Sequence, residues 1–336
     1  LAILSVLTVR LWSNLRFLHW ASRPAPGPSV PHPRVSVLIP ARNEASSITL
    51  CVDSLLRQNY RNAEIIVLDD HSTDGTGELL DAMTRRDPRL KVIHAADDLP
   101  AGWNGKSYAC QRLAEQATGD WLLFTDADTE HMPGSIARGI DRATMLNVDL
   151  LSVLPYQRAE SWSERLVVSF IVDFLPLIGL GLKAIWRGEE SHVAANGQYL
   201  LVRASSYWAT GGHRAIATAR VDDFALAKRF RMSGHTIAFL NGTDMLRCRM
   251  YHGAGEVWNG FLKNVLLGLE TSSLEQRPKW FALPFAWGYA CLFFLPYYHF
   301  VFTRQRKLAL VEIGWLAALR GMAGLFLKRP VMEVLT

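Results

Sequence analysis

The feature that most constrains the fold is a pair of short β-branched runs separated by a helix-like stretch. "VSVLIP" (35–40) and "EIIVLDD" (64–70) are apolar and end abruptly in polar residues, and "ITLCVDSLLRQ" (48–58) lies between them. This order is typical of a β-α-β unit, in which a helix joins two parallel strands. We therefore expect an α/β domain built on a Rossmann-like, mostly parallel sheet flanked by helices.

The pattern continues with "LKVIHA" (90–95) and "DWLLFTD" (120–126), separated by a helical stretch around 106–117. In open parallel sheets, ligands bind beyond the carboxyl ends of the strands. The polar residues expected at that edge are Arg42, Asn43, Glu44, Asp69, Asp70, Asp126 and Asp128. The sequence therefore predicts a ligand site at the carboxyl edge of the sheet.

Apolar stretches flank this domain in a chain of 336 residues that is 49% hydrophobic. The chain begins at Leu1 without a Met, as a truncated or processed chain would, and its first residues are expected to end a membrane helix. A signal peptide is the alternative, although no small-residue cleavage site follows. Residues 22–34 contain five prolines, which favour an extended linker.

The C-terminal part holds the strongest membrane signal. Residues 281–302 carry no charge over 22 residues, the length and composition of a transmembrane helix. Residues 308–327 are a second candidate, whereas 166–186 is apolar but interrupted, which favours a segment lying against a membrane. Two or more membrane segments are therefore expected around the α/β domain.

Charge and cysteine usage exclude some functions. The net charge of +5 is spread near apolar stretches rather than in one basic run, which suits an anionic lipid surface and argues against a nucleic-acid partner. The cysteines are far apart, without a C-x-x-C motif or a Cys/His cluster, so neither a disulfide framework nor a structural zinc site is indicated. They are Cys51, Cys110, Cys248 and Cys291.

Two acidic motifs carry the chemistry. Asp126 and Asp128 are two residues apart, so both carboxylates can face the same hard cation. A magnesium or manganese ion bridged to a diphosphate fits, although D-x-D is also common in solvated loops. "LDDHSTDGT" (68–76) follows a strand, and helix capping accounts for Asp74 in it but not for the two preceding acids.

With "VLIPARNEA" ending the first strand and D-x-D ending the fourth, the ensemble resembles the inverting family 2 glycosyltransferases, which have the A-type nucleotide-sugar-binding fold. The resemblance spans roughly residues 35 to 265. It implies a nucleotide-diphosphate sugar donor, with a UDP-sugar expected, and a divalent metal ion (Mg or Mn). Within that family, the sequence resembles membrane-associated members that glycosylate lipids such as carotenoids or hopanoids.

On that resemblance, the donor-side roles fall on residues at the strand ends. Asp70 would read the base edge and Asp69 would lie toward the ribose, while Lys106 in "PAGWNGKSYA" would lie near the donor. A P-loop is the rival interpretation of "GKS", but Pro100 stands where that motif needs a glycine. The nucleoside pocket would be lined by Pro40, Ala41 and Glu44, and the metal would be held by Asp126 and Asp128.

The acceptor-side roles come from later segments. "VDDFALAKRF" (221–230) lies where the family carries Glu-Asp, which makes Asp223 the expected base and Asp222 its shortened neighbour; helix capping is the alternative. Residues 194–213 resemble the acceptor-side stretch, although a simple turn explains Asn196 and Gly197 equally well. Trp258 and Lys263 would lie near the diphosphate or the acceptor.

Together these features predict a membrane-associated inverting glycosyltransferase that moves a sugar to a lipid hydroxyl at the cytoplasmic face of the cell inner membrane. A processive polysaccharide synthase and a non-catalytic nucleotide-binding membrane protein are the alternatives. The expected organisation is an N-terminal membrane helix (1–21), a linker (22–34), a catalytic nucleotide-sugar-binding domain (35–240), a membrane-interface segment (241–280) and C-terminal transmembrane helices (281–327).

Overall fold

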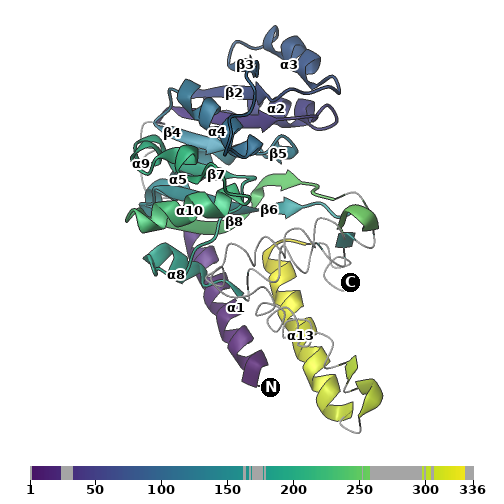
Figure 1. Cartoon of the computed structure of the whole chain (residues 1–336). Helices are drawn as coiled ribbons and strands as arrows, with labels where there is room; N and C mark the ends of the chain where they lie inside the picture. The colour runs from purple at the N-terminus through teal and green to yellow at the C-terminus, as the bar shows by residue number, and fades with distance from the viewer. Residues whose placement is uncertain are drawn as a thin grey trace. The chain divides into compact units, whose positions relative to one another are not determined.

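The chain forms two compact units (Figure 1). The computed structural model describes residues 2–23, 33–161, 164–165, 168, 177, 179–251, 253–257, 297–298, 300–303 and 306–329. One unit comprises residues 17–158 and 181–250 and contains the sheet, and the other comprises residues 1–16, 159–180 and 251–336. The expected site falls within the first unit, apart from Trp258 and Lys263, which lie outside the described residues.

The sheet has eight strands in the order β3-β2-β1-β4-β7-β6-β8-β5. All its strand pairs are parallel except β4 with β7, β6 with β7 and β5 with β8, so β7 and β5 run against the rest. The strands are β1 (Val35–Ala41), β2 (Ala63–Asp69), β3 (Leu90–His94), β4 (Trp121–Phe124), β5 (Thr129–His131), β6 (Leu150–Gln157), β7 (Leu200–Arg203) and β8 (Ile237–Cys248).

The expected mostly parallel α/β fold is confirmed, and its first four strands lie where the sequence predicts them. The helices between them are α2 (Ile48–Leu56), α3 (Thr76–Thr84) and α4 (Gly105–Gln116). β1 and β2 are rich in β-branched and apolar residues and are almost entirely buried. A central strand covered on both faces requires such a continuous apolar run.

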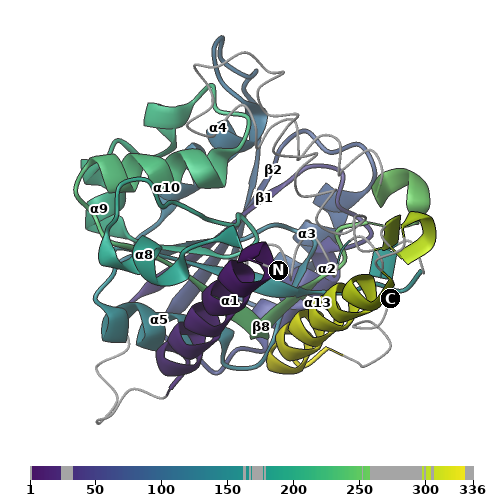
Figure 2. The same ribbon diagram turned by 90° about the horizontal axis from the view of Figure 1, so that it is seen from below.

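Helices cover both faces of the sheet (Figure 2). On one face, Phe124 of β4 packs against the rings of Tyr207 and His213, which belong to α9 (Ala204–Ala209) and the 3₁₀-helix η2 (Gly212–Ile216). On the other face, the Tyr199 hydroxyl donates to the carbonyl of Ser135 in α5 (Ser135–Leu146) at 3.2 Å. Figure 2 shows α4, α9 and α10 (Asp222–Met232) together on one side of the strands and α5 on the other.

The second half of the sheet was not predicted. β8 pairs in parallel with β6 from Ile237 to Gly242, and the register shifts between Pro155 and Tyr156. Beyond the shift β8 also pairs antiparallel with β5, so that Cys248 lies opposite Thr129. The strand thus runs across residue 240, the expected end of the catalytic domain, and returns to the D-x-D segment.

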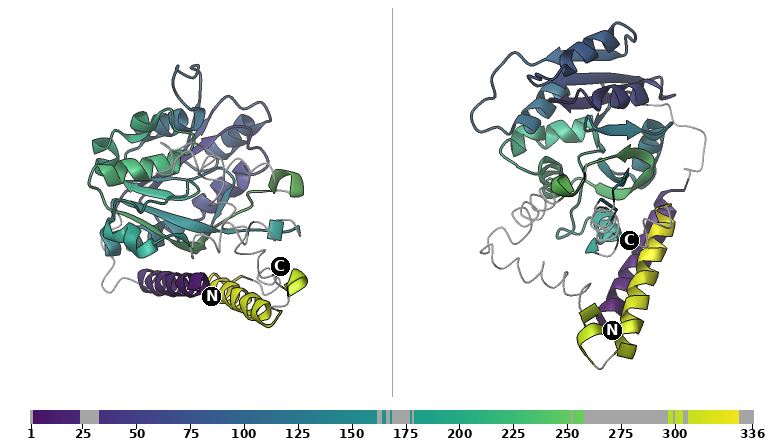
Figure 3. Two further views of the ribbon diagram at one scale, coloured as in Figure 1. Left: turned by 60° about the horizontal axis from the view of Figure 1, so that its bottom comes forward. Right: turned by 90° about the vertical axis from the view of Figure 1, so that its right-hand side faces the viewer.

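The second unit contains two long helices, α13 (Arg306–Phe326) and the first part of α1 (Ala2–Ala21), which lie side by side (Figure 3). The Trp315 indole donates to the Thr8 hydroxyl at 2.9 Å. In the part of the chain that the structure describes, α13 alone is long and apolar enough to cross a membrane. α1 is helical, as expected, but does not reach that apolarity, and most of 281–302 lies outside the described residues.

Candidate active site

The carboxyl ends of β1, β2 and β4 meet at one edge of the sheet. Ala41, which is almost fully buried, is paired in register with Asp69, and the amide of Thr125 donates to the carbonyl of Leu38 at 3.1 Å. Asp126 is therefore the second residue beyond a strand that adjoins β1. This topology gathers the acids of two distant motifs at the edge where parallel sheets bind ligands.

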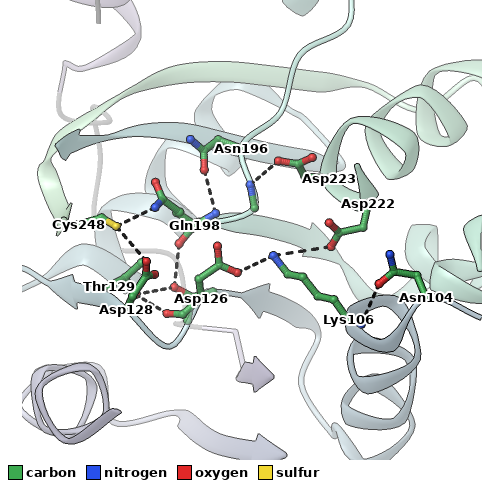
Figure 4. A network of polar contacts seen from close by, with 12 residues as sticks. Asn104, Lys106, Asp126, Asp128, Thr129, Asn196, Gln198, Asp222, Asp223 and Cys248 are labelled. Atoms are coloured by element: carbon green, nitrogen blue, oxygen red, sulfur yellow. Dashed lines mark hydrogen bonds and ion pairs between the residues drawn. The ribbon is translucent and has the colours of Figure 1, made fainter. Parts of the chain in front are cut away.

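The D-x-D segment is a tight turn between β4 and β5. The Thr129 hydroxyl donates to the Asp126 carbonyl at 2.8 Å, which fixes the backbone of the turn. The Cys248 thiol donates to Oδ2 of Asp128 at 3.4 Å, and Gln198 Nε2 donates to the same sulfur at 2.8 Å. The end of β8 thus holds Asp128 in place (Figure 4).

The charge of Asp128 is not well compensated by its surroundings. Protein atoms around the carboxylate disfavour its ionised form, and the negative charges of Asp126 and Glu44 add repulsion, so that the pKa of Asp128 is raised to about 6. A cation would relieve both effects. Carboxylate oxygens are the ligands that Mg²⁺ and Mn²⁺ prefer, so Asp126 and Asp128 fit the expected metal.

Lys106 lies between the D-x-D motif and the acids of α10. Asn104 caps α4 by accepting a hydrogen bond from the Lys106 amide at 3.0 Å, which sets the direction of the lysine side chain. Its ammonium lies 2.7 Å from Oδ1 of Asp126 and 3.9 Å from Oδ2 of Asp222 (Figure 4). Burial lowers the pKa of Lys106, but the two carboxylates outweigh it and raise the pKa well above its usual value.

Asp223 is the second residue of α10 and is held by two backbone amides. Its Oδ2 accepts from the amide of Gly197 and its Oδ1 from the amide of Phe224, each at 2.7 Å. The second bond is a helix-start contact, as the capping alternative requires, but the first connects the carboxylate to the 194–213 segment. Burial and the neighbouring charge of Asp222 raise the pKa of Asp223 to about 6.

The turn before β7 approaches the lysine closely. A Cβ on Gly197 would lie 3.3 Å from Lys106 Nζ, which is a tight contact, and 3.6 Å from Asp223 Oδ2, which is an ordinary one, so the backbone here lies against both side chains. The side-chain oxygen of Asn196 accepts from the amide of Gln198 at 2.9 Å, which is an ordinary turn contact. Asn196 therefore has a local structural role, and Gly197 touches the site.

The expected nucleoside side lies at the ends of β1 and β2. Asp69 is nearly buried and pairs with the His94 ring at 3.1 Å, while Asp70 lies 3.6 Å from Arg42 Nη1. A Cβ on Gly105 would lie 3.8 Å from Asp70 Oδ2, which puts this acid beside the residue before Lys106. The Asp70 carboxylate thus neighbours the lysine segment.

Sequence comparison decides the family. The profile of glycosyl transferase family 2 matches residues 36–206, which contain the D-x-D motif, Asp69, Asp70 and Lys106. The chain belongs to glycosyl transferase family 2.

Two curated relatives of this glycosyltransferase are 4,4'-diaponeurosporenoate glycosyltransferases. The enzyme of Staphylococcus haemolyticus is 28% identical over 295 residues, which cover 86% of this chain and 74% of the relative. That of Staphylococcus aureus is 27% identical over 259 residues, covering 76% of this chain and 66% of the relative. The matched part thus spans just under two thirds of the S. aureus relative.

Among solved structures, the glycosyltransferase resembles mannosyltransferase PcManGT from Pyrobaculum calidifontis in complex with GDP-Man and Mn²⁺. The TM-score is 0.56 at 19% identity, and the alignment covers 99% of this chain and 97% of the other. At this identity the likeness shows the fold alone, which is the expected A-type glycosyltransferase fold.

The sequence did not point to three side chains that the glycosyltransferase brings to the site. The Cys248 thiol donates to Asp128, Gln198 donates to that sulfur, and His213 lies in η2 against α10. A Cys or His with no local motif gives no sequence signal of its own. Only the β5–β8 pairing and the packing of η2 reveal their positions.

Proposed function

We propose that the enzyme transfers a sugar from a nucleotide-diphosphate donor, a UDP-sugar in the first instance, to a lipid acceptor with inversion at the anomeric carbon. One observation carries this proposal. The ammonium of Lys106 links the D-x-D carboxylate Asp126 to Asp222, and Asp223 is the next residue of α10 (Figure 4). This order would place positive charge at the donor diphosphate and a carboxylate base on the acceptor side, as a single displacement uses.

On the donor side, Glu44, Asp69 and Asp70 would contact the nucleoside. A divalent cation held by Asp126 and Asp128 would neutralise the diphosphate and stabilise it as it leaves. The Lys106 ammonium is within reach of the same diphosphate and would add positive charge where negative charge develops. Asn104 fixes the start of α4, from which the lysine side chain would turn from Asp126 to the diphosphate.

On the acceptor side, Asp223 would take the proton from the attacking hydroxyl. Burial and the charge of Asp222 raise the pKa of Asp223 to about 6, so the carboxylate is ionised at neutral pH and is a stronger base than an exposed aspartate. The amides of Gly197 and Phe224 hold both oxygens, which fixes the direction from which an acceptor can be deprotonated. A single displacement from that side would invert the anomeric configuration.

A lipid acceptor is supported by the relatives and by the second unit. The relatives are transferases that act on 4,4'-diaponeurosporenoate. α1 and α13 expose large apolar side chains, including Val9 at 68% and Leu325 at 74%, as a lipid-facing surface would. We place the enzyme at the cell inner membrane with its catalytic domain on the cytoplasmic side, where Trp258 and Lys263 would lie near the diphosphate or the acceptor.

The relatives' substrate name favours a second class of acceptor. Diaponeurosporenoate is a carboxylate by name, and a carboxylate is already ionised at neutral pH. Transfer to such an acceptor would form an ester and would not need Asp223 as a base. The two classes of acceptor therefore differ in how strongly they depend on this residue.

The experiment is a donor screen with membranes that contain the enzyme. Released nucleoside diphosphate is measured for each nucleotide sugar, and the labelled lipid is then identified by mass spectrometry. We expect nucleoside diphosphate release with one donor, together with one glycosylated lipid. Asp128→Asn should abolish this release. Turnover with a soluble polysaccharide as the sole labelled product would instead support a processive synthase, and absence of release with every donor would contradict the proposal.

A further inference from the structure

A cysteine, a histidine and the first aspartate of the acid pair come together from three different elements. Cys110 belongs to α4, His213 to η2 and Asp222 to the start of α10, and η2 packs against both helices. One ligand atom from each residue lies within 4.8 Å of those of the other two. We propose that these three residues bind a thiophilic divalent cation of the Zn²⁺ type, at a site separate from Asp126 and Asp128.

The three donors suit zinc better than magnesium. A thiolate, an imidazole and a carboxylate are the ligand types of zinc sites, whereas Mg²⁺ takes oxygen ligands alone. Zinc–ligand bonds of about 2.0 to 2.3 Å correspond to donor separations of about 3.5 Å, so small rotations of the side chains would close the observed spacing. Cys110 and His213 are 2% and 1% exposed, which leaves the fourth position on the side of the half-buried Asp222 for water.

The histidine is already oriented as a ligand. The Tyr207 hydroxyl lies 2.9 Å from Nδ1 of His213, accepts from the His213 backbone amide at 3.1 Å, and lies 3.4 Å from Oε1 of Gln111. All three contacts are satisfied together when Nδ1 carries the proton and Tyr207 donates to Gln111. That tautomer leaves the lone pair on Nε2 for a metal, as the outer partners of metal-bound histidines commonly do.

Asp222 is available to the same cation. Among the described residues it accepts no hydrogen bond, and its ion pair with Lys106 is long, at 3.9 Å. Coordination would form a metal–sulfur bond at Cys110 and release the thiol proton to solvent.

Occupation of this site would act on the transfer reaction. The cation would hold Asp222 away from Lys106 and break the ion pair that joins α10 to the lysine. We therefore expect zinc to inhibit turnover. This second part rests on the proposed function, whereas binding of the metal does not.

The test uses Co²⁺ as a spectroscopic substitute for zinc, with the purified full-length chain in detergent and excess Mg²⁺ to occupy the carboxylate site. We expect a sulfur-to-cobalt charge-transfer band that saturates at one ion per chain and is lost in Cys110→Ser. The matched control is Cys248→Ser, because that thiol is the one beside Asp128. This variant should keep the band.

Two further variants keep the inference testable if Cys110→Ser does not fold. Asp222→Asn removes a ligand, and Tyr207→Phe removes the partner of Nδ1; each should weaken cobalt binding by at least about tenfold. A wild-type chain without the band, or a band that survives Cys110→Ser, would overturn the site. Loss of the band in Cys248→Ser alone would place the sulfur at the D-x-D motif. If the band is present but added zinc does not lower turnover, the metal site stands and only its inhibitory role is overturned.

Discussion

Replacing Asp223 with Asn tests whether this carboxylate acts as a base or only holds the turn before β7. The change keeps the shape of the side chain and removes its basicity. A general base typically contributes about 10²- to 10⁴-fold in rate, or about 3 to 5 kcal/mol of transition-state stabilisation. We expect turnover with a hydroxyl acceptor to fall by that factor.

The structural cost of the substitution can be estimated from the two hydrogen bonds. The introduced side-chain amide can accept through its oxygen only, so its NH₂ group must face the backbone amide of Gly197 or of Phe224. An unsatisfied donor costs about 1 to 3 kcal/mol, but the neutral side chain also relieves the burial of a charge beside Asp222. The net loss of stability should be small compared with the loss in rate.

Single-turnover rates and donor titrations separate these effects, and the melting temperature reports on folding. Asp222→Asn is the matched control, because it removes a charge from the same helix turn but loses only a long ion pair with a partly exposed lysine, worth a fraction of about 1 kcal/mol. It should slow transfer less. An Asp223→Asn enzyme with an unchanged chemical step on a hydroxyl acceptor, or a product that retains the donor's configuration, would refute the role of the base.

Three other predictions concern pH, metal and packing. The acidic limb of kcat/KM should lie near pH 6, because the base must be ionised, and Asp222→Asn should move it to lower pH by removing the repulsion that raises the pKa of Asp223; a limb that stays in place would contradict this. EDTA treatment should abolish nucleoside diphosphate release until excess Mg²⁺ is added back, and Asp128→Asn should abolish it even with Mg²⁺ present; activity that persists in EDTA or in the variant would remove the metal from the D-x-D motif. Gly119→Ala places a Cβ 2.6 Å from a backbone nitrogen in β1, so it should destabilise the fold by about 1 to 3 kcal/mol in thermal melts, whereas Gly314→Ala, with nothing within 4 Å, should leave the melting temperature close to wild type.

The first half of the sheet and the acids at its edge could be predicted because the information is local. Apolar runs and the polar residues that follow them specify β1, β2 and β4 without reference to the rest of the chain. Parallel packing then gathers Asp69, Asp70, Asp126 and Asp128 without further information. The family resemblance supplied the later acids of α10.

The remainder depends on pairings between distant segments. Cys248 reaches Asp128 because β8 changes register near Gly242 and joins β5, a strand of three residues. No periodicity in the sequence marks so short a strand or so late a shift. His213 and Cys110 likewise lie in unrelated stretches, and only the packing of η2 between α4 and α10 brings them to one place.

The contact between Lys106 and Asp126 also has a thermodynamic consequence. The lysine ammonium occupies the Oδ1 side of Asp126 at 2.7 Å, where a divalent cation would bind, so the two positive charges compete for one carboxylate. Metal arriving alone would have to displace the lysine, whereas metal arriving with a diphosphate would give the displaced ammonium a new anionic partner. If the metal binds as proposed, Lys106 is an internal counterion that disfavours free metal and favours the metal–nucleotide pair, and we expect donor and cation binding to be positively cooperative.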